Sequence, residues 1–275
     1  MKDLREILDV NSNVPVIILC GGMGTRLREE TEYRPKPLVE VGGRPILWHI
    51  MKIYGASGFK RFILCLGYKG EMIKQYFLNY RLTTRNFTLR LDSDEEPVVE
   101  MNGEPEEWTI TFADTGTKAM TGARVKRIER YIDSEEVMLT YGDGVSNIDL
   151  GELLKFHRSH GKLATVTAVH PLARFGELLI EGNRVVQFAE KPQAIDGFIN
   201  GGFFVFNRRV FSYLSDDDGC VLEREPLERL AGDGELMTYH HQGFWHCMDT
   251  YRDLQALNQL WESASPPWKV WRRSE

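Results

Sequence analysis

A glycine-rich loop directly follows the first strongly apolar segment of the chain. Residues 16–20 (VIILC) are apolar, and GGMGTRL follows at 21–27. Closely spaced glycines let backbone N–H groups approach an anion without a Cβ in the way. The forked guanidinium of Arg26 adds a positive charge beside them. From the glycines alone, phosphate binding and a purely structural turn both stay open.

Two further cations lie on a stiff stretch soon after this loop. Arg34 and Lys36 alternate with Pro35 and Pro37. A proline restricts the residue before it to extended conformations, so we expect an extended backbone that aims the Lys36 side chain. A compact ammonium aimed at a polyanion suits a triphosphate. A solvated basic loop is the alternative interpretation.

Other phosphate-binding and catalytic motifs do not match. No Gly-Lys-Ser/Thr follows the loop, as a Walker A motif requires, and Leu27 occupies the third glycine position of a dinucleotide fingerprint. A dehydrogenase is therefore disfavoured. The histidines lack HExxH spacing. We interpret them, including His246 beside Cys247, as surface or core residues.

Two aspartates far apart in the sequence stand at places suited to a ligand. Asp143 lies between two glycines, directly after the apolar run 137–141. This puts its carboxylate at the carboxyl end of a strand, where α/β folds bind ligands. Asp249 follows the segment 243–245 (GFW), which is able to pack a site shut. Taken singly, each aspartate is also typical of a turn or a helix cap.

These motifs resemble those of a known enzyme family. GGMGTRL and RPKPLVEVGGRPILWHIM resemble the nucleoside-triphosphate signature of sugar-1-phosphate nucleotidyltransferases. Further segments are similar to glucose-1-phosphate cytidylyltransferases and occur in the same order across about residues 14–272. They are LGYKGEMIKQYF, DTGTKAMTGARVKR, TYGDGVSNIDL, RFGELLIE, EKPQ, INGGFFVFN, GELMTYHHQGFWHCMDTYRD and PPWKVW.

The resemblance implies a role for each matching position. The substrates would be a nucleoside triphosphate, with CTP favoured, and a sugar-1-phosphate. Nucleotide-binding residues would be Leu19, Gly21, Gly22, Gly24, Thr25, Arg26, Lys36, Arg124 and Gly142. The sugar phosphate would lie against Glu190, Lys191, Asn200 and Gly201. Asp143 and Asp249 would share a Mg²⁺ ion and, with Arg26 and Lys36, form the catalytic set.

The implied reaction is an in-line attack of the sugar phosphate on the α-phosphate of the triphosphate. A phosphomonoester has its second pKa near ~6, so the nucleophile is largely ionised at neutral pH and needs no general base. The obstacle is repulsion between two polyanions, which positioning and charge neutralisation overcome. Thymidylyl, uridylyl or guanylyl transfer is the alternative reaction, and a non-catalytic nucleotide-sugar sensor is the alternative class.

The elements that must position these residues follow an α/β rhythm. Apolar runs ending in glycine predict strands at 16–20, 62–66 and 137–141, with a further strand at 164–170. Amphipathic spacing predicts helices at 46–54, 71–80, 150–160, 223–230 and 255–263. The pattern indicates a doubly wound, mostly parallel sheet. The resemblance makes it the Rossmann-like nucleotidyltransferase type.

The rest of the chain reads as additions to that sheet. Residues 87–91 and 108–112 alternate like an antiparallel hairpin, whose acidic tip at 92–107 we expect in solvent. Strand patterns dominate 174–206, so we expect a β-rich, sugar-binding second half that covers one end of the sheet. Residues 1–13 read as an N-terminal arm and 14–275 as one domain. Its nucleotide-binding half is about 14–150 and its sugar-phosphate half about 151–275.

Composition excludes several functional classes. The 275 residues carry a formal net charge of −6, so neither nucleic acid nor an acidic membrane is an expected partner. The longest apolar runs are far shorter than the ~18 residues of a membrane span. Four cysteines without CxxC spacing, and no signal-peptide core, predict a reduced, cytoplasmic protein. The family resemblance implies a homo-oligomer, a trimer or larger, that serves polysaccharide or deoxysugar synthesis.

Overall fold

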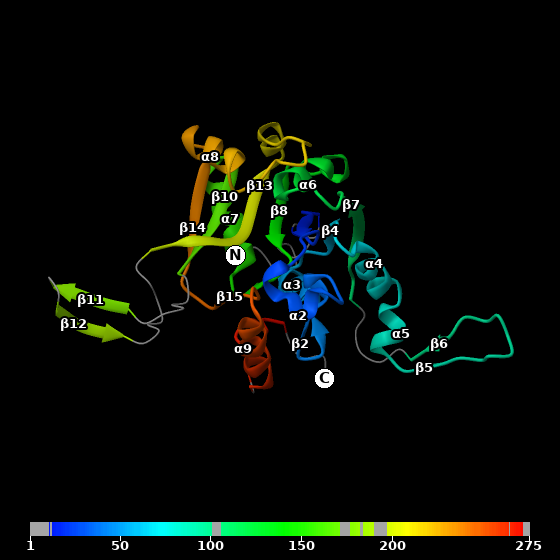
Figure 1. Ribbon diagram of the computed structural model, residues 1–275. Helices are drawn as coiled ribbons and strands as arrows, with labels where there is room; N and C mark the ends of the chain where they lie inside the picture. The colour runs from blue at the N-terminus through cyan, green and yellow to red at the C-terminus, as the bar shows by residue number, and fades with distance from the viewer. Residues whose placement is uncertain are drawn as a thin grey trace, which may run out of the picture.

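A seven-stranded sheet forms the centre of the molecule (Figure 1). The computed structural model describes residues 11, 13–100, 106–170, 177–181, 184–189, 197–263 and 265–271. In spatial order the strands are β14 (Leu236–His241), β10 (Ala164–Val169), β13 (Ile199–Asn207), β8 (Glu136–Tyr141), β1 (Val16–Leu19), β4 (Arg61–Leu66) and β7 (Thr109–Asp114).

Neighbouring strands of this sheet are parallel except around β13. The pairs β1–β4, β1–β8, β4–β7 and β10–β14 are parallel, whereas β13 is antiparallel to both β8 and β10. Strand β1 shows why these apolar runs become central strands. Ile17 packs into one core and Ile18 into the other, so both faces of the strand are buried. The predicted mostly parallel α/β sheet is confirmed.

Helices cover both faces of the sheet and make three layers. One face packs on α3 (Ile46–Ala56), α4 (Gly70–Leu78), α7 (Leu150–His160) and α9 (Tyr251–Glu262). The other face packs on α6 (Thr121–Arg127), the 3-10 helix η4 (Arg208–Tyr213) and α8 (Glu225–Gly232). The expected alternation of strands and helices therefore places two separate apolar cores around one sheet.

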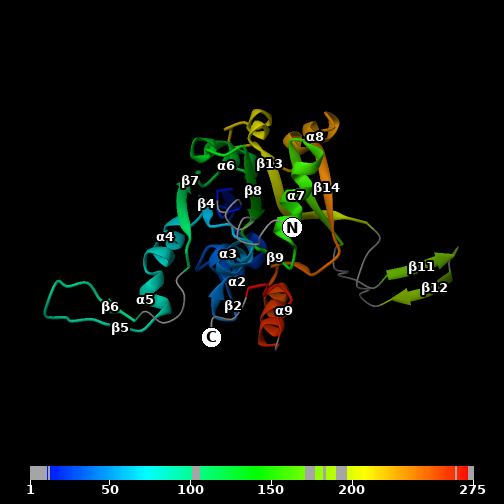
Figure 2. The same cartoon turned by 180° about the vertical axis from the view of Figure 1, so that it is seen from behind.

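The remaining elements are short. Two-stranded pairs are formed by β2 (Glu40–Val41) with β3 (Arg44–Pro45), β5 (Phe87–Thr88) with β6 (Val98–Val99), β9 (Gly144–Ser146) with β15 (Trp245–Cys247), and β11 (Glu177–Glu181) with β12 (Arg184–Ala189). The short helices are η1 (Thr25–Leu27), α2 (Arg28–Thr31), η2 (Lys36–Leu38), α5 (Tyr80–Thr84) and η3 (Glu129–Tyr131). In both views the β5–β6 and β11–β12 pairs extend from the body on opposite sides (Figures 1 and 2).

The predicted hairpin between residues 87–91 and 108–112 is wrong. Thr109–Asp114 forms β7, which pairs in parallel with β4 at the edge of the central sheet. Phe87–Thr88 pairs instead with Val98–Val99. An edge strand with one partly exposed face alternates in the same way as a strand of an exposed hairpin, so periodicity does not identify the partner. The acidic stretch is described at 92–100, where it is largely exposed, and at 106–107, where Glu106 is half-buried and pairs with Lys52.

The second half of the chain is rich in strands, as predicted, but it does not merely cover one end of the sheet. Strands β10, β13 and β14 extend the central sheet itself. Phe203 and Phe204 of β13 are buried on opposite faces, which explains why this strand inserts between β8 and β10. The division into one arm and one domain stays a prediction, because residues 1–10 and 12 lie outside the described part.

The cysteines and helices agree with two further expectations. All four cysteines, Cys20, Cys65, Cys220 and Cys247, are free, and the first two are buried. That the protein is kept reduced stays a prediction. Among the described residues, no helix has the length and apolar character needed to cross a membrane.

Two histidines are buried and hydrogen-bonded. His49 is 0% exposed, with Nε2 2.8 Å from the Val41 carbonyl oxygen and Nδ1 accepting from the Trp268 indole. His157 is 3% exposed and its Nδ1 lies 2.8 Å from the Thr165 hydroxyl. Burial is the main reason that the pKa of each histidine is lowered to about 4.

We expect stability to fall on acidification below neutral pH. The unfolded chain binds protons to these histidines below pH ~6.5, whereas the folded chain resists protonation down to pH about 4. Their contribution is thus complete above pH ~6.5 and declines towards pH 4, by about 3 kcal/mol for each histidine. Urea unfolding at pH 7.5, 6.0 and 5.0 measures this decline. His157→Gln should flatten it, whereas the exposed His240→Gln should not; equal slopes in both variants would contradict the assignment.

Candidate active site

The loop after β1 turns sharply because of its glycines. Gly24 has φ +62°, in the left-handed region that favours glycine, and a Cβ there would lie 2.6 Å from the Thr31 methyl carbon. Directly after it, the chain enters η1, where Leu27 is fully buried. The loop is therefore fixed at both ends, by strand β1 and by the buried Leu27 side chain.

The guanidinium group of Arg124 hydrogen-bonds to the backbone of this loop and holds it in place. Its Nη2 donates to the Gly21 carbonyl oxygen at 3.0 Å, and its Nη1 lies 3.0 Å from the Leu66 carbonyl oxygen and 2.8 Å from that of Gly116. The same nitrogen is 2.8 Å from the Thr115 hydroxyl. A Cβ at position 21 would lie 2.1 Å from Nη1 of Arg124, so only glycine lets the guanidinium reach this place. Arg124 is 4% exposed and thus ties the loop to the ends of β4 and β7.

Lys36 lies between the two aspartates that the sequence singled out. Its Nζ is 2.6 Å from Oδ2 of Asp143 and 2.9 Å from Oδ1 of Asp249. Arg26 reaches the same cluster from the surface, with Nη1 2.9 Å from Oδ2 of Asp249. The side chains of Lys36 and Asp249 are each 12% exposed, whereas that of Arg26 is 68% exposed. The predicted convergence of the two carboxylates on Lys36 is confirmed.

A short antiparallel pairing brings Asp249 to Asp143. Strand β15 pairs with β9, so that Cys247 stands opposite Gly144 and the Met248 N–H donates to the Asp143 carbonyl oxygen at 2.9 Å. The chain then leaves β15 and enters α9 through a capping box formed by Thr250 and Asp253. Asp249 is thereby fixed between a strand end and a helix start.

The charges of this cluster stabilise one another. Burial alone would lower the pKa of Lys36, but the hydrogen bonds and charges of Asp143 and Asp249 outweigh it and raise that pKa. Burial alone would raise the pKa of Asp249, but Lys36 and Arg26 hold it below its usual range. Burial raises the pKa of the Cys247 thiol, which hydrogen-bonds to Asp249. Asp249 is therefore a paired anion beside a neutral thiol.

The predicted extended backbone at Lys36 is wrong. The extended conformation reaches only Pro35, with φ −67° and ψ 147°. Lys36 then begins the 3-10 helix η2, because the Leu38 N–H donates to the Pro35 carbonyl oxygen and the Val39 N–H to that of Lys36. The lysine is still rigidly held, but by a turn anchored through the buried Leu38 rather than by an extended run.

A cleft of about 360 Å³ opens beside this cluster, at the carboxyl ends of β1 and β8. Lys36 and Asp143 line it, and so does every residue that the sequence predicted to bind a nucleotide. These are Leu19, Gly21, Gly22, Gly24, Thr25, Arg26, Lys36, Arg124 and Gly142. The position agrees with the rule that ligands bind at the carboxyl ends of parallel strands. Direct contact of each residue with a nucleotide stays a prediction.

The residues predicted for the sugar phosphate are only partly described. Asn200 and Gly201 lie on β13, where Asn200 Nδ2 is 3.1 Å from the Tyr141 hydroxyl and the Gly201 carbonyl oxygen accepts from the Trp245 indole at 2.7 Å. Since Tyr141 lines the cleft, Asn200 adjoins it. Glu190 and Lys191 lie outside the described residues.

The structure adds residues that the sequence reasoning missed. Cys247 offers its sulfur within 4.8 Å of carboxylate oxygens of Asp143 and Asp249, making the three a possible metal-binding group. The position of Cys247, two residues before Asp249 in the sequence, is the signal that could have indicated it. Thr121 and Tyr141 line the cleft, and Glu223 hydrogen-bonds to both. No spacing in the sequence connects Glu223 with the loop.

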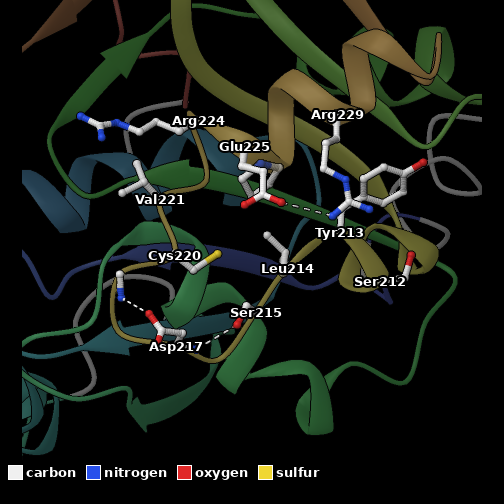
Figure 3. Close-up of a pocket in the computed structure, with 12 residues that line it drawn as sticks. Ser212, Tyr213, Leu214, Ser215, Asp217, Cys220, Val221, Arg224, Glu225 and Arg229 are labelled. Atoms are coloured by element: carbon white, nitrogen blue, oxygen red, sulfur yellow. Dashed lines mark hydrogen bonds and ion pairs between the residues drawn. The ribbon is translucent and has the colours of Figure 1, made fainter.

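A larger cavity of about 460 Å³ lies elsewhere, between η4 and the start of α8 (Figure 3). Of the predicted site residues that the structure describes, none lines it. Its Arg229 pairs with Glu225 at 3.6 Å and lies over the Tyr213 ring, so this cation is already compensated. The charged groups suited to binding phosphates and a metal ion therefore lie in the smaller cleft.

Comparisons with known proteins agree with this site. Residues 15–262 match the family described as nucleotidyl transferase. A Salmonella typhi protein named glucose-1-phosphate cytidylyltransferase is 50% identical over 256 residues, 93% of this chain and 98% of that protein. A Bacillus subtilis protein named probable glucose-1-phosphate cytidylyltransferase is 48% identical, covering 93% of this chain and 99% of its own. The resemblance drawn from the motifs is confirmed.

A solved structure supports the fold. HddC from Yersinia pseudotuberculosis, complexed with GMP-PN, has a TM-score of 0.66 at 21% identity. The alignment covers 90% of this chain and 100% of that one. At this identity the likeness concerns the arrangement of strands and helices alone.

We expect Arg124→Met to destabilise the protein by about 2–4 kcal/mol, because it removes the hydrogen bonds of a buried guanidinium to the carbonyl oxygens of Gly21, Leu66 and Gly116. Hydrogen exchange should also become faster at residues 20–24, which lose their support from Gly21. Arg127→Met is the matched control, since the Arg127 side chain is 31% exposed and bonds mainly to carbonyl oxygens at the surface. Equal exchange in the loop of both variants would show that Arg124 does not hold it.

Proposed function

The chain belongs to the nucleotidyl transferase family, and on that premise we propose that it joins CTP to glucose-1-phosphate, yielding CDP-glucose and pyrophosphate. The observation that carries the proposal is the placement of Lys36 between Asp143 and Asp249 at the edge of the glycine-loop cleft. The identity of 50% to a glucose-1-phosphate cytidylyltransferase over nearly the whole chain supports the choice of substrates.

The chain's task in this reaction is to bring two polyanions together. The sugar phosphate attacks the α-phosphorus in line, the new P–O bond forms, and the bond to the leaving pyrophosphate breaks. No base is needed, because a phosphomonoester with a second pKa near ~6 is already ionised. Catalysis then depends on orientation and on positive charge placed where negative charge develops.

Lys36 and Arg26 supply the chain's own positive charge. Lys36 is held deep in the cluster and would lie against the α-phosphate and the leaving pyrophosphate. Arg26 is 68% exposed, so its guanidinium can follow the outer phosphates. Phosphate oxygens would compete with Asp143 and Asp249 for these two cations. The backbone N–H groups of the glycine loop would bind further phosphate oxygens. Arg124 holds this loop in place through the Gly21 carbonyl oxygen.

The residues of the cluster fit Mg²⁺. Asp143 and Asp249 offer hard oxygen ligands within 4.8 Å of each other, which suits an ion that takes one or two carboxylates plus phosphate oxygens and water. Cys247 fits as a protonated neighbour, because burial raises its thiol pKa and the thiol hydrogen-bonds to Asp249. When bound, Mg²⁺ would supply further positive charge that offsets the negative charge of the phosphates. The two carboxylates would hold it while Lys36 turns to the phosphates.

Other assignments are disfavoured or stay predictions. A non-catalytic sensor has no need for two carboxylates and a buried lysine, all of which the cluster contains. Transfer of a uridylyl, thymidylyl or guanylyl group is the alternative reaction. A homo-oligomer of three or more chains, a cytoplasmic location and a place in polysaccharide or deoxysugar synthesis remain predictions.

A substrate panel tests the proposed reaction. We expect pyrophosphate release with CTP and glucose-1-phosphate to exceed that with UTP, dTTP or GTP by at least about tenfold in kcat/KM, because cytosine presents an amino donor where uracil and thymine present an oxygen. Release should stop when EDTA removes Mg²⁺ and return when the ion is restored. Equal rates with CTP and UTP, or full activity in EDTA, would refute the assignment.

Substitutions in the cluster test the roles of its members. Lys36→Ala should lower kcat by about 10²–10³-fold, because it removes one fixed cation beside the reacting phosphate. Asp143→Asn and Asp249→Asn should lower kcat and raise the Mg²⁺ concentration for half-maximal rate. Lys52→Ala is the matched control, since Lys52 forms a half-buried pair with Glu106 outside the cleft. Turnover by Lys36→Ala equal to that of Lys52→Ala would remove Lys36 from the mechanism.

A further inference from the structure

Four side chains form a hydrogen-bonded network along one wall of the cleft. Both carboxylate oxygens of Glu223 accept from hydroxyls, one from Thr121 at 2.6 Å and the other from Tyr141. The Tyr141 hydroxyl in turn lies 3.1 Å from Nδ2 of Asn200. We call these four residues, Thr121, Glu223, Tyr141 and Asn200, the Glu223 network. It joins four segments that are distant in the sequence.

The direction of every bond in the Glu223 network follows from two backbone N–H groups. The Gly202 N–H, which can only donate, lies 2.8 Å from Oδ1 of Asn200 and so fixes the orientation of that amide. Nδ2 must then face Tyr141, whose oxygen accepts. The Tyr141 proton is therefore free to go only to Glu223, which accepts it.

The same reasoning holds at the other end of the network. The Leu222 N–H donates to Oγ1 of Thr121 at 2.9 Å, so the Thr121 proton is directed to the second oxygen of Glu223. Glu223 therefore accepts a hydrogen bond at each of its two oxygens. The hydroxyl groups of Thr121 and Tyr141 thus both donate to Glu223.

The Glu223 network connects the two parts of the site. Thr121 and Tyr141 line the cleft, and Thr121 begins helix α6, which carries Arg124. Tyr141 ends β8, two residues before Asp143, and its ring packs edge-on against the buried Phe204. Asn200 is exposed on β13 beside the cleft. Glu223 therefore connects Thr121 and Tyr141, which line the cleft, with Asn200, which is predicted to bind the sugar phosphate.

We propose that Glu223 is a positioning residue that holds Tyr141 as an acceptor, so that Asn200 presents its second amide N–H to an acceptor oxygen of the sugar phosphate. The inference rests on the proposed function, since it names the ligand as that sugar phosphate. Without an acceptor at position 223 the Tyr141 proton turns toward Asn200, where it meets an N–H group. The Asn200 amide then keeps only its bond from the Gly202 N–H, so its side chain is held less firmly.

Glu223→Met is the first test, because the side chain keeps a similar length but has no oxygen that could accept from Tyr141. We expect the KM for the sugar phosphate to rise about tenfold, the loss of roughly one oriented hydrogen bond, and the KM for the nucleotide to stay within about twofold. The ligand is whichever sugar-1-phosphate the wild-type protein turns over best, so an error in the sugar does not affect the test.

Tyr141→Phe is the second test and breaks the network at one oxygen only. It should raise the KM for the sugar phosphate by a similar factor. The double variant should be no worse than Tyr141→Phe alone, because both changes interrupt one chain of bonds. Glu225→Met is the matched control, since Glu225 follows shortly after in the same segment but faces the other cavity (Figure 3) and pairs with Arg229. It should leave both KM values unchanged.

The outcomes separate this inference from the proposed function. A wild-type protein that turns over no pair of triphosphate and sugar phosphate refutes the proposed function. An active wild type whose Glu223→Met variant raises both KM values equally, or loses only melting temperature, shows a merely structural role for Glu223. If the double variant raised the KM for the sugar phosphate by the product of the two single effects, the proposed network would also be overturned.

Discussion

The site depends on one interaction, the contact of the Lys36 ammonium with the carboxylates of Asp143 and Asp249. A half-buried charge lowers stability unless it has a partner of opposite charge. The contacts of this cluster therefore constrain the positions of the strands and helices that carry its three side chains. Asp143 is placed by the end of β8, Asp249 by β15 and the capping box of α9, and Lys36 by the turn η2. A shift of any of these elements would leave a buried charge unpaired.

The glycine loop receives its rigidity from a different source. Arg124 is a buried cation whose bonds go to neutral carbonyl oxygens and one hydroxyl. It draws the Gly21 carbonyl inward, and the N–H groups of the loop are positioned accordingly. A site that neutralises polyanions gains from donors fixed before the ligand arrives, because little reorganisation is then needed during reaction. The cluster supplies charge, and Arg124 supplies preorganisation.

Local patterns predicted the parts of the fold whose causes are local. Buried runs such as 16–20 and 137–141 became central strands, and amphipathic spacing at 150–160 became α7 over the same residues. The failures have physical causes as well. Alternation in Thr109–Asp114 fitted a hairpin, yet the partner is β4, because an edge strand shows the same period. The prolines around Lys36 predicted extension, yet turn hydrogen bonds fold that stretch into η2.

The sequence by itself determined the fold class, the glycine loop, the family and the residue types that neutralise phosphates, since these depend on neighbouring residues and on recognisable motifs. Only the tertiary structure decided which distant groups meet. Lys36 and Asp249 are 213 residues apart in the sequence and are joined through the pairing of β9 with β15. Glu223 reaches Tyr141 across 82 residues without any local signal. Such contacts depend on backbone hydrogen bonds and packing between remote segments, which local periodicity does not specify.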